Sequence, residues 1–430
     1  MSQPLIADQQ FLMPGIQQIA SRSQLVIERG EGAILWDERG RAFIDLFAGV
    51  GVCSVGHSHP RFVATVTEQL NKVIVGSFST KIRAELLQLL ASVTPGDLKR
   101  FQFYSCGSEA VEAALRLARS YTKKQNFLSF WGGFHGKTLG SLGLCGVDFK
   151  RDYQPMPPGY TSVPYAECYH CPFHLKYPEC KLACVDFARQ TIEQDLEGNL
   201  AAIVVEPIQG TNGNVVPPPP YLSALRQLAS DCGALLIVDE IITGFGRTGQ
   251  MFASSSLEVL PDVIVVGKGM ANGLPISGLI SNDELSSAEP FAKPSGSSSS
   301  FGGNPIVCAA ALATLQIIID EKLDENAKKV GSWFLKELQG FKGRYPFVGN
   351  VQGEGLMIGI ELVRDGDPNC PLEKEITLEI FDRMVQAGVI MMCYGAKIRI
   401  NPPLGISQEL CEKALMTMDE VFDSIANDYF

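Results

Sequence analysis

The sequence has no long apolar run and no excess of basic residues. No stretch approaches the ~18 consecutive apolar residues that a membrane span needs, so we expect no membrane partner. The first residues lack a basic segment followed by an apolar one, so we expect no signal peptide and a cytoplasmic location. Asp and Glu number 47 against 36 Lys and Arg, which gives a net charge of −11. Because nucleic-acid binders rely on a basic surface, we also expect no nucleic-acid partner.

The sequence also lacks internal repeats and the composition of a disordered chain. Its 430 residues are 46% hydrophobic and 19% charged, which is typical of globular proteins. The only low-complexity stretch is the Ser- and Gly-rich segment 293–304, which predicts an irregular loop. At ~150 residues per domain, the length predicts two or three domains and ample chain to bury a large core.

Apolar runs separated by amphipathic segments predict an α/β core. Residues 24–46 alternate short apolar runs with Gly turns, which indicates hairpins. A strand is expected at 101–105 and a helix at 109–121, and residues 305–338 should be largely helical. Almost purely apolar runs are typical of strands buried on both faces of a parallel sheet. Three such runs occur, at 201–205, 234–238 and 263–266.

Reactive side chains follow these predicted strands. Gly107 and Ser108 come after the first strand, at the start of the helix, and Glu206, Asp239 and Lys268 follow the three later ones. Because ligands bind at the carboxyl ends of strands in open α/β sheets, we expect these groups to converge. A helix start binds phosphate through its free N–H groups. A lysine between glycines, in a crowded site, is suited to forming a Schiff base.

Each of these features alone has a simpler interpretation. Ser108 is suited to an ordinary helix cap, and most lysines after strands are solvated. A carboxylate as deep as Asp239 needs a partner, either a protonated pyridine nitrogen or an arginine such as Arg247. Together, however, an anion cradle, a carboxylate and an amine in this order are what a pyridoxal phosphate enzyme requires.

Motifs spread over nearly the whole chain carry a family resemblance. They are ILWDERGRAFIDLFAGVGVCSVGHSHP, SCGSEAVEAALRLAR, GGFHGKT, VVEPIQG, LLIVDEIITGFGRTG, VVGKGMANGLPISGLI, SFGGNP and IRINPPL. With them the chain resembles the class III, or ω-type, aminotransferases of pyridoxal phosphate fold type I, in particular the 4-aminobutyrate and ornithine aminotransferases. The resemblance implies a large, mainly parallel α/β/α cofactor domain over residues 58–325. It also implies a smaller α+β domain built from both chain ends, residues 1–57 and 326–430.

The resemblance implies a role for each matching residue. Lys268 would bind the cofactor covalently and then move the substrate proton, while Asp239 would pair with the pyridine nitrogen. Arg399 would bind the substrate carboxylate, a task suited to a bidentate guanidinium. Ser300 would reach the phosphate of a neighbouring subunit, which implies a homodimer with shared active sites. The other implied cofactor contacts are Gly107, Ser108, Phe134, His135, Glu206 and Ile241.

The chain departs from the family pattern at positions expected in the substrate pocket. Thr211 stands where the 4-aminobutyrate and ornithine members carry a Glu that pairs with the carboxylate-binding Arg, so 4-aminobutyrate is not predicted as the donor. Lys137 replaces an Arg that can touch substrate, and a lysine cannot bind a carboxylate bidentately. Gly51 stands where bulkier residues often line the pocket, which leaves room for a larger donor.

The sequence therefore predicts that an amino group moves from a primary amine to a 2-oxo acid in two half-reactions. An aminotransferase acting on amino sugars is one alternative, favoured by the acidic composition together with Thr211 and Lys137. An amino-acid racemase or a decarboxylase of the same fold is another. The last alternative is a non-enzymatic protein that is stabilised by a metal ion bound to its cysteines.

Four of the 12 cysteines lie in one short segment, at Cys168, Cys171, Cys180 and Cys184. The pair spacing is typical of a closed zinc site, so these cysteines are candidate ligands of a structural zinc ion. The simpler interpretation is a set of reduced thiols in a surface loop.

Overall fold

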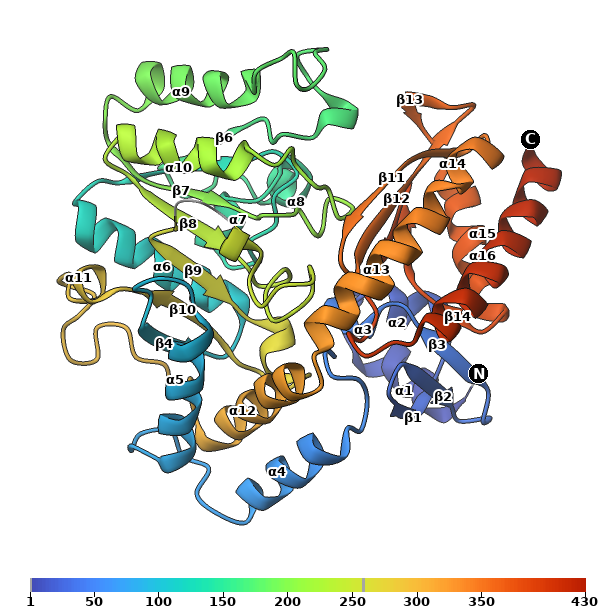
Figure 1. The fold of residues 1–430 in the computed structure, drawn as a ribbon, viewed down its shortest axis with the longest axis horizontal. Helices are drawn as coiled ribbons and strands as arrows, with labels where there is room; N and C mark the ends of the chain where they lie inside the picture. Colours follow the sequence, from blue (N-terminus) through green and yellow to red (C-terminus); the bar gives the residue numbers. More distant parts are fainter. Residues whose placement is uncertain (1, 257–259) are drawn as a thin grey trace.

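The computed structural model describes residues 2–256 and 260–430, and its largest sheet has seven strands (Figure 1). The strand order is β4-β10-β9-β8-β7-β5-β6. Strands β5 to β9 pair in parallel, while β10 runs antiparallel to both of its neighbours. The prediction of a mainly parallel sheet is therefore confirmed. The strands are β4 Arg100–Tyr104, β5 Asn126–Phe130, β6 Tyr160–Val163, β7 Leu200–Val205, β8 Leu235–Asp239, β9 Val263–Val266 and β10 Ser277–Ser281.

Helices cover both faces of this sheet. Helix α6 (Gly107–Thr122) packs a buried face of Ala, Val and Leu on one side. Its first turn is closed by Glu109, whose carboxylate accepts from the backbone N–H groups of Ser105 and Cys106. Helices α9 (Ala183–Asp195) and α10 (Tyr221–Asp231) cover the other side. Strands β7 to β9 are buried throughout, as their apolar runs predict.

The two chain ends meet in a second sheet. Strands β1 (Ile27–Glu31), β2 (Ile34–Asp37) and β3 (Ala42–Asp45) form the predicted hairpins, and β14 (Val389–Ile390) pairs with β3 in parallel. A third sheet holds the remaining carboxyl-terminal strands. These are β11 Val348–Glu354, β12 Met357–Arg364, β13 Asp367–Pro371, β15 Met392–Gly395 and β16 Lys397–Ile400.

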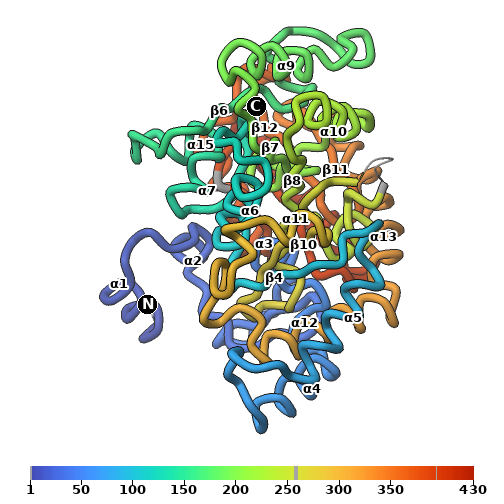
Figure 2. The backbone as a smooth tube through the Cα atoms, turned by 90° about the vertical axis from the view of Figure 1, so that its left-hand side faces the viewer, coloured from blue at the N-terminus to red at the C-terminus, as the bar shows by residue number. Residues whose placement is uncertain are grey.

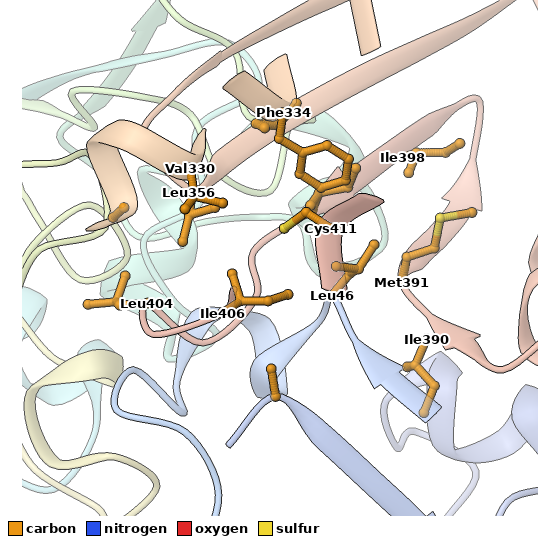
Figure 3. Close-up of a cluster of buried hydrophobic side chains, with 14 of the residues drawn as sticks. Leu46, Val330, Phe334, Leu356, Ile390, Met391, Ile398, Leu404, Ile406 and Cys411 are labelled. Atoms are coloured by element: carbon orange, nitrogen blue, oxygen red, sulfur yellow. The ribbon is translucent and has the colours of Figure 1, made fainter. Parts of the chain in front are cut away.

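Side chains from both chain ends share one core. Helices α13 (Leu323–Gln339) and α15 (Lys374–Gln386) pack against the third sheet, and α16 (Gln408–Tyr429) packs against both helices. In Figure 3 an amino-terminal side chain lies among carboxyl-terminal ones. The labelled residues are Leu46, Val330, Phe334, Leu356, Ile390, Met391, Ile398, Leu404, Ile406 and Cys411, all buried.

The remaining long helices link these parts. Helices α4 (Pro60–Leu70) and α5 (Lys81–Val93) pack against α12 (Pro305–Asp320). The helical prediction for 305–338 is confirmed by α12 and α13, and residues 293–304 form the predicted irregular loop. Helix α1 (Gln3–Phe11) projects from the body in Figure 2, whereas α2 (Gln18–Ser23) is joined to it by the ion pair between Arg22 and Asp382. Among the residues described, no helix has both the length and the apolar character that crossing a bilayer requires.

Candidate active site at the strand ends

A cavity of about 180 Å³ lies where the carboxyl ends of β7, β8 and β9 meet the start of α6. The groups that the strand pattern predicts to converge do so here. The lining residues are Gly107, Ser108, Phe134, His135, Gly136, Glu206, Gly210, Thr211, Asp239, Ile241, Ile242 and Lys268. The cavity therefore combines a helix start, two carboxyls, an imidazole and an amine.

Asp239 is paired with His135 at the base of the cavity. His135 Nδ1 lies 2.7 Å from Asp239 Oδ2, and both side chains are buried. The backbone N–H of Ile241 donates to the other carboxylate oxygen at 3.0 Å. Burial alone would lower the pKa of His135, but the hydrogen bond and the charge of Asp239 raise it overall. The Arg247 alternative for Asp239 is wrong, because Arg247 Nη1 donates to backbone carbonyls instead.

Lys268 follows β9 after one residue, Gly267, and opens a short 3-10 turn, Lys268–Ala271. Its backbone is left-handed, with φ of 39°, a conformation uncommon for residues other than glycine and typical of strained functional positions. Burial lowers the pKa of the Lys268 amine, and the charge of Arg399 adds to this effect, while Asp239 and Glu206 oppose it. The neutral, nucleophilic form of the amine is therefore more accessible than in a solvated lysine.

Glu206 connects two loops at the cavity wall. Its Oε1 accepts from the backbone N–H of Phe134 at 2.8 Å, and its Oε2 accepts from that of Gly210 at 3.0 Å. Burial raises the pKa of Glu206 to about 7; the nearby Asp239 adds to the shift, and His135 opposes it. The carboxyl therefore fixes the loops after β5 and β7 in position around the cavity.

The three residues predicted to contact substrate lie in different positions relative to the cavity. Arg399, on β16, donates from Nη1 to the Gly210 carbonyl at 3.1 Å, and its charge reaches Lys268, so it lies beside the cavity. Gly51 is buried behind Ile242: a Cβ on it would lie 3.7 Å from Ile242 Cγ1. The Lys137 side chain is exposed, and its backbone N–H donates to Ser108 Oγ at 3.2 Å.

Ser300 lies outside this lining. It is exposed in the irregular loop before α12. Its predicted contact is with a second subunit, and that contact stays a prediction.

The four clustered cysteines are free thiols in the lining of a second, smaller cavity. Cys168, Cys171, Cys180 and Cys184 all line this space of about 20 Å³, which is the size of a single water-sized sphere. The one set of three or more candidate ligands within 4.8 Å of one another, in the described part of the chain, is Glu167, His170 and Glu361. The sulfur positions therefore do not add support for a zinc site, and this hypothesis stays a prediction.

Several residues of the site carry no signal that the sequence interpretation used. Gly136, Gly210 and Ile242 line the cavity next to predicted residues, within the GGFHG, EPIQG and IVDEII motifs. Cys145 lies beneath His135: its Sγ accepts from the His135 backbone N–H at 3.2 Å. The motifs that contain the glycines were available as a signal, whereas nothing in the sequence points to Cys145.

Known proteins resemble this chain over nearly its full length. The sequence pattern of the family described as aminotransferase class-III matches residues 17–422. The acetylornithine aminotransferase of Methanothermobacter thermautotrophicus is 36% identical over 414 residues, which cover 95% of this chain and 97% of that protein. The alanine/serine racemase of Pyrococcus horikoshii is 35% identical over 408 residues, covering 91% of this chain and 84% of that protein.

A solved structure shares both the fold and the sequence pattern. An amine transaminase from an uncultivated Pseudomonas species, solved with pyridoxal phosphate bound, superposes with a TM-score of 0.89. The two are 30% identical, and the match covers 96% of this chain and 98% of that one.

Proposed function

From the premise that this chain belongs to the class-III aminotransferase family, we propose that its amine donor carries a carboxylate and that its acceptor is a 2-oxo acid. The enzyme is a pyridoxal phosphate-dependent aminotransferase. One observation carries the substrate proposal: Lys268 and the Asp239–His135 pair line a single cavity, and Arg399 lies beside it, bonded to the Gly210 carbonyl of the lining.

The residues around this cavity fit pyridoxal 5′-phosphate. The start of α6 offers N–H groups and the Ser108 hydroxyl to a phosphate. Gly107 leaves room there, since a Cβ on it would lie 2.8 Å from Ile241 Cδ1. Asp239 would hold the pyridine nitrogen and Lys268 the aldehyde carbon. The walls of the ring site would be Phe134, His135, Glu206 and Ile241.

When bound, the cofactor supplies an electron-accepting ring that stabilises negative charge at the substrate carbon. The chain's own part begins with Asp239, whose two oxygens are fixed by His135 and by the Ile241 backbone. A fixed carboxylate keeps negative charge in place without reorganisation. Lys268 Nζ, with its lowered pKa, takes the proton from the substrate carbon and returns it.

The residue at position 211 influences which amine donors the site can accept. Arg399 anchors a carboxylate through its guanidinium and is held to the Gly210 carbonyl at 3.1 Å. Thr211, the next residue along, is uncharged, so it does not compete with a substrate carboxylate for Arg399. An amino acid and a 2-oxo acid each bring such a carboxylate, so the two half-reactions use Arg399 in the same way.

A matched pair of donors tests this proposal. The loaded enzyme is mixed with L-leucine or with 3-methylbutylamine, which differs only by lacking the carboxylate, and carbonyl product per site is measured by mass spectrometry. We expect L-leucine to react ~10²-fold faster, in line with a charge-assisted contact. Arg399→Gln should remove most of this preference. Equal rates for the two donors in the unmodified enzyme would overturn the proposal.

Control variants separate the chemistry from unfolding. Lys268→Ala should abolish product formation, while Lys336→Ala, at an exposed position of α13, should leave it unchanged. Turnover that persists in the Lys268→Ala variant would refute the assigned role.

A racemase is the second candidate, because the Pyrococcus horikoshii racemase is 35% identical. A racemase inverts an amino acid without consuming an oxo acid. Chiral chromatography of L-alanine incubated with the enzyme alone, and then with 2-oxoglutarate, distinguishes the two. D-alanine formed without any oxo acid would favour the racemase.

A second copy of the chain is proposed to complete the site. Gly76 lies against Asn304, so the segment 73–78 and the loop before α12 are side by side. Large apolar side chains are exposed on both, next to Ser300. They are Val73, Ile74, Val75, Phe78 and Phe301. Sedimentation analysis should give a dimer, and Phe301→Asp should weaken it; an active monomer would refute the dimer.

Two further expectations stay predictions. Metal analysis of the purified protein tests for zinc at Cys168, Cys171, Cys180 and Cys184, and a metal-free protein would remove that hypothesis. The cytoplasmic location is tested by cell fractionation.

A further inference from the structure

A cysteine, a histidine and an aspartate form a hydrogen-bonded chain away from the cofactor cavity. Cys53 Sγ lies 3.6 Å from His57 Nδ1, and His57 Nε2 lies 2.8 Å from Asp45 Oδ2. The other oxygen of Asp45 accepts from the backbone N–H groups of Phe47 and Ala48 at 2.9 and 2.7 Å. The carboxylate is therefore held rigidly, and it fixes the imidazole with one nitrogen directed at the sulfur.

A buried guanidinium adjoins this chain. Arg247 is 1% exposed, and its Nε and Nη2 have no hydrogen-bond partner among the described residues. Its Nη1 donates to the carbonyls of Leu356 and Pro402, which carry no charge. The negative groups that act on it are Cys53, the stronger, and Asp45. Burial lowers the pKa of Arg247 to about 10, so it stays a cation at neutral pH.

Protonation of His57 leaves this cluster short of one negative charge while the thiol is neutral. Burial alone would lower the pKa of His57, but its bonds to Asp45 and Cys53, and the negative charge of each, raise it to about 10. With His57 protonated, two cations, His57 and Arg247, face the single carboxylate of Asp45. Buried charges require compensation, and an ionised sulfur beside two cations provides it.

We propose that Cys53 is a buried thiolate and a site of reversible oxidation by small hydroperoxides. Cys53 is 9% exposed as a residue, so a small oxidant can reach it more readily than a substrate-sized molecule. The first oxidation step involves Cys53 alone and needs no second cysteine. The thiolate attacks one oxygen of the peroxide, an S–O bond forms and the O–O bond breaks. Sulfur is oxidised by two electrons to a sulfenic acid, and the leaving hydroxide takes the His57 proton and becomes water.

Oxidation of Cys53 would affect the active site, because hydrogen bonds connect the segment after Cys53 to active-site segments. The Val55 backbone N–H donates to Asn272 Oδ1, and Asn272 Nδ2 donates to the Gly56 carbonyl, both at 3.0 Å. These bonds fasten the segment after Cys53 to the turn that begins with Lys268. The Leu404 backbone N–H donates to the Ser54 carbonyl at 2.8 Å, which ties the same segment to the chain beyond Arg399. After this step the His57 proton has gone to water, so the ion pair between Cys53 and His57 is lost and the buried sulfur carries an added oxygen; we therefore expect this region to loosen and activity to fall.

The test compares labelling rates of the loaded enzyme by iodoacetamide at pH 6.5 and pH 9.5. Mass spectrometry follows Cys53 and, in the same sample, the exposed Cys370. The ratio of the two rates for one cysteine cancels its accessibility and reports only ionisation. An ordinary thiol labels about fifty- to hundredfold more slowly at the lower pH. We expect less than a threefold difference for Cys53, the ordinary difference for Cys370, and at least a tenfold difference for Cys53 in His57→Gln.

A second measurement uses hydrogen peroxide with dimedone as the trap for sulfenic acid. Adduct at Cys53, loss of activity and recovery with dithiothreitol support the proposal, provided that Cys53→Ser and Cys53→Ala both resist the loss. The proposal is overturned if Cys53 shows the ordinary pH difference, or stays unlabelled at pH 9.5 while Cys370 reacts. It is also overturned if the peroxide inactivates both Cys53 variants as fast as the parent enzyme.

Discussion

Two Asp–His pairs of nearly equal geometry serve different parts of the molecule. The pair at the cofactor cavity joins His135 Nδ1 to Asp239 Oδ2 over 2.7 Å, with both side chains buried. The pair behind β3 joins His57 Nε2 to Asp45 Oδ2 over 2.8 Å, with the imidazole 24% exposed. In both cases the carboxylate raises the pKa of the imidazole above its ordinary value.

What differs is the neighbour of each pair. Asp239 faces the cavity with Lys268 and Glu206, so its charge is available to a ligand. Asp45 is not among the residues that line this cavity, and its oxygens accept from His57 and from two backbone N–H groups. The first pair is thus expected to act on chemistry and the second on stability. The following changes test that division, beginning with the largest expected effect.

Replacing Asp239 with Asn should have the largest effect. The amide keeps the shape but removes the negative charge that the ring nitrogen requires, so turnover should fall ~10²–10³-fold, in line with the loss of one preorganised electrostatic contact. Steady-state kinetics give the turnover, and the denaturation midpoint gives the stability. A turnover within tenfold of the parent enzyme would contradict the assignment of this pair to the chemistry.

Replacing Asp45 with Asn should act on stability instead. Breaking a buried pair from one side leaves a charge unpaired and costs about 3 kcal/mol. Turnover at 20 °C should change less than tenfold, provided that the variant stays folded. Denaturant unfolding at a fixed protein concentration measures the loss, since dimer stability depends on concentration.

The effect of Asp45→Asn should depend on pH in a defined direction. The pKa of His57 is raised to about 10 from an unfolded value near 6.5, so its contribution is complete below about pH 6.5 and is lost as the pH rises toward 10. The stability difference between parent and variant should therefore shrink between pH 6.5 and 10. A difference that grows over this interval would show that His57 is not the group stabilised by Asp45.

The sequence predicted the convergence of the active-site groups but not their pairing. Parallel strands bring their carboxyl ends to one edge of a sheet, so positions such as Glu206, Asp239 and Lys268 follow from apolar runs alone. The contact of His135 with Asp239 joins residues 104 positions apart, and no local pattern encodes it. Strand β10 was not predicted from the sequence, and a buried run would not by itself have revealed its antiparallel direction.

The spacing of residues in the sequence predicted which side chains converge at strand ends, but it was a poor guide in irregular segments. The Cys-rich segment has the spacing of a zinc site, yet its path through short turns decides where each sulfur lies. In contrast, Cys53 and His57 stand four residues apart and do meet. Helix α6 starts at Gly107 and not at 109, because Glu109 closes the first turn from within the helix.

Replacing Glu206 gives the next test, in which the pH-dependent part of the free energy of unfolding should change by about 1–2 kcal/mol. Its pKa is raised to about 7 by burial, so the folded protein retains a proton that the unfolded chain releases above about pH 4.5. Stability should therefore fall as the pH rises from 4.5 to 7 and then level off. Glu206→Gln removes this titration, so the stability of the variant relative to the parent should increase between pH 5 and 7.5. Unfolding of the cofactor-free proteins measures it, and a flat difference over this range would contradict the raised pKa.

Replacing Cys145, the cysteine beside the His135–Asp239 pair, should have the smallest effect on stability and turnover. It also contrasts with Cys53, the cysteine beside the His57–Asp45 pair. Cys145 Sγ accepts from the His135 backbone and also lies 3.4 Å from the Gly136 and Ser141 carbonyls, to which it can donate. Burial raises the pKa of this thiol to about 11, so it stays neutral where the enzyme works. Cys145→Ser keeps an acceptor and a donor at the same place and should cost about 1 kcal/mol of stability, with turnover within about threefold. If Cys145→Ser instead made the enzyme resistant to hydrogen peroxide, the sensitive sulfur would lie at the cofactor cavity, and the division of the two pairs into chemistry and stability would not extend to their cysteines.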